Sequence, residues 1–77
     1  MNNKRRKAIE QIAVKLEDLK TEFEFLRDEE QEAFDNLPEG IQASERGEAM
    51  ETIIYNMEEV LENLESALDG INELEEG

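Results

Sequence analysis

The fold is decided by residues 47–76, GEAMETIIYNMEEVLENLESALDGINELEE, a stretch of thirty residues that contains no Lys, Arg or His. Its apolar residues recur at alternating steps of three and four, which is the heptad spacing of a coiled-coil helix. They are Met50, Ile53, Met57, Val60, Leu64, Ala67, Ile71 and Leu74. The pattern predicts an acidic helix over residues 45–75 that packs along one side against another helix.

The same spacing appears in the first half of the chain, at Ile9, Ile12, Leu16, Leu19, Phe23 and Leu26. It predicts a first helix over residues 3–36. Pro38 cannot continue a helix and Gly40 permits a turn, so residues 37–44 are expected to form the connection. Ser44 is the expected N-cap of the second helix, because Ser is favoured at this position and acidic residues follow it in the first turn.

Two long helices joined by a short connection predict an all-α fold, an antiparallel two-helix hairpin of the coiled-coil type, with residues 1–77 in one domain. The second helix carries a further apolar row that lies outside the heptad positions expected to face the first helix. This row consists of Ile54, Leu61 and Leu68. On the other side of the seam, the small or uncharged Ala49, Asn56, Asn63 and Gly70 recur at the same spacing. A hairpin of this size buries little apolar surface by itself. We therefore expect a homodimeric four-helix bundle with Ile54, Leu61 and Leu68 in the dimer interface.

Charge constrains the partners. Twenty-two acidic and eight basic residues give a formal net charge of -14, and from Asp28 onward seventeen acids are opposed only by Arg46. Such a chain repels nucleic acid and anionic membranes, so a basic protein partner is expected, with no direct binding to nucleic acid or to a membrane. The cations of residues 4–7 are not followed by a long apolar run, and a cytoplasmic protein is expected.

Few residues of the chain suit catalysis. With neither Cys nor His, the common zinc and iron–sulfur sites and disulfides are excluded. Glu58, Glu59 and Glu62 have the EExxE spacing of helical nucleotide pyrophosphohydrolases that hold magnesium, but no ExxD follows and no suitably placed Lys or Arg is present to hold phosphates. We expect a protein that is not an enzyme, with no catalytic residues, no cofactor and no metal.

The acidic face of the second helix is the candidate partner-binding site, formed by Glu51, Glu58, Glu62, Glu65 and Asp69. Carboxylates three or four residues apart on a helix lie about 5–6 Å from each other. Two hairpins side by side in a rod of about 45 Å would carry about one negative charge per 1.6 Å, near the ~1.7 Å of duplex DNA. DNA mimicry is one hypothesis. A solubilising acidic surface, an assembly adaptor using helix–helix contacts and an EExxE enzyme are the alternatives.

Residues 30–48, EQEAFDNLPEGIQASERGE, resemble the central stretch of small acidic helical-hairpin proteins of bacteriophages and mobile elements of Gram-positive bacteria. The likeness is carried mainly by LPEGIQASERGE, residues 37–48. It implies a phage or prophage origin, the host cytoplasm and no defined activity. Since small acidic proteins from that source include inhibitors of host defence nucleases, the resemblance favours a phage-encoded inhibitor that acts by DNA mimicry.

Overall fold

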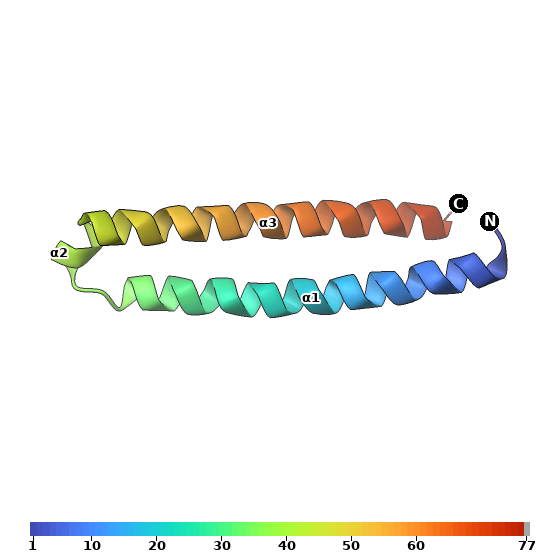
Figure 1. Cartoon of the computed structure of the whole chain (residues 1–77), viewed down its shortest axis with the longest axis horizontal. Coiled ribbons are helices and arrows are strands. Elements are labelled where there is room, and N and C mark those ends of the chain that lie inside the picture. Colours follow the sequence, from blue (N-terminus) through green and yellow to red (C-terminus); the bar gives the residue numbers. More distant parts are fainter. Residues whose placement is uncertain (77) are drawn as a thin grey trace.

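The computed structural model describes residues 1–76, and the side chains of residues 1–75. Helix α1 (Asn3–Asp35) and helix α3 (Glu45–Glu76) lie antiparallel, with the short helix α2 (Glu39–Gln42) in the connection between them (Figure 1). The molecule is a rod with extents of 59 × 15 × 13 Å. The all-α antiparallel hairpin is confirmed, and the ends of both long helices lie within one residue of the predicted ones.

The long helices begin at polar N-caps. The Asn2 side chain accepts a hydrogen bond from the Arg5 backbone N–H at 2.8 Å, which satisfies one of the free donors at the start of α1. At the start of α3, the Gly47 backbone N–H donates to the Ser44 hydroxyl oxygen at 3.4 Å. This contact confirms Ser44 as the N-cap of α3.

The connection is more ordered than the sequence predicts, because it contains α2, a single turn that begins after Pro38. The Gln42 side-chain amide donates to the carbonyl oxygens of Phe34, at 3.1 Å, and Asp35, at 3.4 Å. It thereby satisfies acceptors at the C-terminal end of α1 that have no partner within that helix. Gly47 is buried where α3 meets α2, and a side chain there would overlap the Gln42 carbonyl.

The core is a single seam between α1 and α3. Ile54, Leu61 and Leu68 are the buried apolar residues in the described part of the chain, with exposed fractions of 6%, 9% and 5%. They alternate along α3 with half-buried residues, Met50, Met57, Leu64 and Ile71. The half-buried seam of α1 comprises Arg6, Ile9, Ala13, Leu16, Lys20, Phe23, Arg27, Glu30 and Phe34. Each helix therefore contributes a heptad stripe to the same seam.

The assignment of Ile54, Leu61 and Leu68 to a dimer interface was wrong, because these residues fill the seam inside the hairpin. Several residues expected in the seam are instead exposed: Ile12, Leu19, Leu26, Ile53, Val60, Ala67 and Leu74. The reason is that Met50, Met57, Leu64 and Ile71 border two apolar rows on α3. The row containing Leu61 and Leu68 offers larger side chains to the seam than the row containing Val60 and Ala67.

Within the residues that the structure describes, neither long helix holds a stretch apolar enough to traverse a bilayer.

Candidate functional site

One side of the hairpin is acidic. Glu24, Glu58 and Glu65 line the same groove between α1 and α3, so they lie on the same side of the seam. Each directly follows a seam residue in the sequence, and so do Glu10, Glu17 and Glu51. We call these six residues, together with the neighbouring Glu62 and Asp69 of α3, the acidic flank. All of them except the half-buried Glu24 are exposed to solvent.

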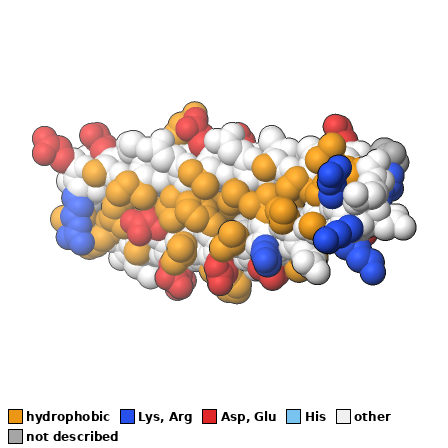
Figure 2. Space-filling view, turned by 45° about the vertical axis from the view of Figure 1, so that its right-hand side comes forward, with side chains coloured by type: hydrophobic (Ala, Val, Ile, Leu, Met, Phe, Trp, Pro, Cys, Tyr) orange, Lys and Arg blue, Asp and Glu red, His pale blue; other side chains and the backbone are white. Residues whose placement is uncertain are grey.

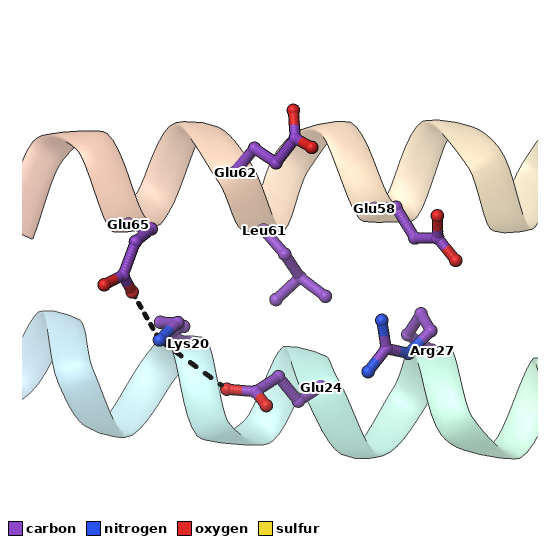
Figure 3. A pocket seen from close by; sticks show the side chains of 7 residues that line it. All are labelled: Lys20, Glu24, Arg27, Glu58, Leu61, Glu62 and Glu65. Atoms are coloured by element: carbon purple, nitrogen blue, oxygen red, sulfur yellow. Dashed lines mark ion pairs between the residues drawn. The ribbon is translucent and has the colours of Figure 1, made fainter.

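Lys20 lies at the centre of the groove on the acidic flank. Its Nζ is 2.5 Å from Glu65 Oε2 and 3.9 Å from Glu24 Oε1 (Figure 3). The hydrogen bond to Glu65 raises the pKa of Lys20, and the negative charges of Glu65, Glu17 and Glu24 raise it further against the opposing effect of partial desolvation. Lys20 therefore stays protonated and ties the two helices together on this side.

Arg27 is the second cation in the groove. Its side chain lies across from Glu58 in Figure 3, while its Nε atom pairs with Asp28 Oδ1 at 2.8 Å. On α3, the Glu62 side chain points away from α1. The groove is lined by Lys20, Glu24, Arg27, Glu58, Leu61, Glu62 and Glu65. With two cations and four carboxylates, it keeps a negative balance.

The structure brings together three of the five predicted binding residues, because Glu58, Glu62 and Glu65 all line this groove. Glu51 and Asp69 lie exposed farther along α3, toward its two ends. Among the described residues, Glu65 is the one of the five that forms an ion pair within the chain. The carboxylates of the other four are therefore free to meet a cationic partner.

Sequence reasoning missed Lys20 and Arg27 as members of this site. Both occupy seam positions of α1. They share one heptad position with Ala13 and Phe34, because these four residues recur every seven residues. That spacing is the available signal. A search for apolar residues at heptad spacing does not find these positions, because Lys and Arg are charged.

The carboxylates of the described residues are spread along the rod. Within the described part of the chain, no three carboxylates converge closely enough to hold a metal ion. In the EExxE segment, the Glu59 carboxylate accepts a hydrogen bond from the Tyr55 hydroxyl, and this contact raises the pKa of Tyr55. The acidic flank is a charged surface exposed to solvent.

The opposite side of the hairpin is apolar. The residues that directly precede seam positions are Ile12, Leu19, Leu26 and Ala33 on α1, and Ile53, Val60, Ala67 and Leu74 on α3. We call these eight residues the apolar flank. All are exposed, including Leu26 at 52% and Ile53 at 49%. Figure 2 shows apolar side chains in a band along the rod on the face that it presents. Because charged residues follow the seam positions and apolar residues precede them, the two long sides of the rod differ chemically.

Comparison of the chain with protein families, with curated proteins and with solved structures finds no match. The likeness of residues 30–48 to phage proteins therefore remains a prediction.

Proposed function

We propose that the protein is a non-enzymatic binding protein whose acidic flank binds a basic surface of another protein. The observation that carries this proposal is the row of exposed, unpaired carboxylates at Glu51, Glu58, Glu62 and Asp69 on one side of a rigid helix. Opposite charge on a partner would steer its approach and fix its orientation on the rod.

The more specific form of this proposal is inhibition by DNA mimicry, in which the rod occupies a basic cleft that otherwise holds nucleic acid. One hairpin carries fourteen net negative charges over 59 Å, about one per 4 Å. Because the rod is longer than the 45 Å expected from the sequence, two hairpins side by side carry about one per 2 Å. This approaches the ~1.7 Å of duplex DNA. Mimicry therefore needs two copies of the chain.

The test is affinity capture with a pair of variants that change charge equally. The first variant replaces Glu51, Glu58, Glu62 and Glu65 by Gln and Asp69 by Asn. Its control makes the same changes outside the acidic flank, at Asp18, Glu22, Glu29, Glu32 and Glu59. Both variants lose five negative charges, so the comparison separates the position of charge from its amount.

A basic protein captured by the native chain, released by moderate salt and displaced by duplex DNA would support the proposal. The control variant should retain this partner, while the acidic-flank variant should lose it. Equal retention by the two variants would contradict a role for the acidic flank.

A second function is favoured by the exposed apolar flank, which suits an assembly adaptor that binds a helix of another protein. Such a complex would resist salt, because apolar burial does not depend on charge attraction. Leu26→Glu should abolish this complex and leave intact the salt-sensitive binding of a basic protein to the acidic flank of a single hairpin.

A further inference from the structure

We propose that the apolar flank is the docking surface for a second copy of this chain, packed face to face and antiparallel to the first. The dimer interface is then formed by Ile12, Leu19 and Leu26 of α1 and by Ile53, Val60 and Leu74 of α3. This surface lies opposite the acidic flank, so the inference is independent of the partner proposed there.

The exposed area of the hairpin is the first reason. A compact monomer of 8.9 kDa exposes about 4,800 Å². This hairpin exposes 5903 Å². The excess is roughly 1,100 Å², comparable to the ~800 Å² that each partner buries in an interface of standard size. One side of a rod 59 Å long and 15 Å wide measures roughly 900 Å², which is enough for the ~800 Å² that each partner contributes.

The second reason is that the surface of α3 around the apolar flank carries no charge. Next to the apolar flank, α3 presents a row of small or uncharged residues, which we call the small-residue row. It consists of Ala49, Asn56, Asn63 and Gly70. Together with Ile53, Val60, Ala67 and Leu74 it forms a strip of α3 without an ionisable group. A basic protein would find no carboxylate here, whereas a second α3 presents the same uncharged strip.

Size complementarity gives the order of the two chains. In the proposed dimer, the two α3 helices run antiparallel and cross at a point midway between Leu61 and Glu62 of each chain. Ile53 then faces Gly70 of the second copy, and Val60 faces Asn63. Leu74 faces Ala49. Each large side chain of the apolar flank meets a member of the small-residue row, which allows the helices to approach closely.

Gly70 supports this close approach, because nothing inside the hairpin requires a glycine there. Its φ is negative, and a Cβ atom would meet no atom within 4 Å. Glycine is unfavourable in a helix interior. In the proposed dimer it provides the space that Ile53 of the second copy fills.

Charge also favours the antiparallel order. At the open end of the rod, the cations of residues 4–7 lie at the same end as Glu73 and Glu75, so their charges largely cancel. The α2 end holds Asp35, Glu39, Glu45 and Glu48, with Arg46 as the cation among them. Antiparallel packing places the nearly neutral end of each hairpin beside the acidic end of the other, whereas parallel packing would place the two acidic ends together and add repulsion.

Sedimentation equilibrium of the native chain and two matched variants tests the interface. The native chain should have twice the monomer mass of 8.9 kDa. Val60→Glu on the apolar flank should weaken dimerisation by about tenfold or more. Val14→Glu, at a valine that is 61% exposed off this flank, should leave it unchanged. A monomeric native chain, or a dimer that Val60→Glu does not weaken, would overturn the proposal.

Disulfide cross-linking tests the order of the chains and does not depend on Val60→Glu folding. The native chain has no cysteine. On oxidation, Val60→Cys mixed with Asn63→Cys should give a disulfide-linked heterodimer. Val60→Cys mixed with Ser66→Cys, on the outer side of α3, should not. Failure of the first pair to cross-link, or equal cross-linking of both pairs, would overturn the antiparallel arrangement.

Discussion

Lys20 on α1 and Glu65 on α3 form the ion pair that joins the two long helices on the acidic flank, with Nζ 2.5 Å from Oε2. A lysine in the seam of a coiled coil usually lowers stability but helps to specify register. Here the carboxylate that meets it comes from the opposite helix, and Glu24 of its own helix lies 3.9 Å away. The pair therefore adds to the buried seam in specifying which residues of α1 and α3 lie level with each other.

Alkaline pH should destabilise the hairpin. The folded-state pKa values of Lys20 and Tyr55 are raised above the ordinary 10.5 and 10.0. A raised folded-state pKa adds stability below the ordinary value, and this stability is lost as pH rises through the folded value. The Tm should therefore fall above about pH 10. Thermal unfolding of Lys20→Met should show a shallower fall than that of Lys15→Met, and identical curves would contradict the role of Lys20.

Leu61→Ala should lower the free energy of unfolding by about 2–4 kcal/mol, because it removes a buried leucine and leaves a cavity in the seam. Phe25→Ala should change it by less than about 0.5 kcal/mol, because Phe25 is 66% exposed. Urea unfolding followed by circular dichroism measures both values. An equal loss in the two variants would mean that the seam is not the core.

Gly47→Ala should lower stability by about 1–3 kcal/mol, because the new Cβ would overlap the Gln42 carbonyl and force α2 away from α3. Gly40→Ala provides the control. A Cβ at Gly40 meets nothing within 4 Å, and alanine there should raise stability by about 0.5–1 kcal/mol. Changes of the same sign in the two unfolding curves would contradict the packing of α2 against α3.

Ser44→Ala should cost about 0.5–2 kcal/mol, because the Gly47 N–H loses its side-chain acceptor at the start of α3. The matched change Ser66→Ala, at an exposed site inside α3, should be neutral or slightly stabilising. Chemical denaturation of the two variants makes the comparison. If Ser44→Ala proved as stable as Ser66→Ala, the capping role of Ser44 would be excluded.

The sequence predicted the helices and their connection well, because heptad spacing, Pro38 and Ser44 are local signals. It did not predict α2, since one turn over residues 39–42 depends on the contacts of Gln42 with the end of α1. Carboxylates spaced along α3 predicted the acidic face. The cations that oppose it could not be placed without knowing which residues of α1 face α3.

The choice of seam was wrong for a related reason. On α3 the row of Met50, Met57, Leu64 and Ile71 borders apolar residues on both sides, so spacing alone permits two seams. On α1 the seam that the structure forms includes Lys20 and Arg27, so apolar spacing alone does not reveal it. Lys20 is accommodated there by Glu65 across the groove, a relationship between residues 45 positions apart.

The two long sides of the rod are proposed to bind by different forces, charge on the acidic flank and apolar burial on the apolar flank. The most direct test is one salt series in which self-association and binding of a basic partner are both measured by sedimentation. Added salt should strengthen self-association, because it screens the repulsion between two chains of charge -14, and should weaken partner binding. If salt changed self-association and partner binding in the same direction, the two flanks would not bind by different forces.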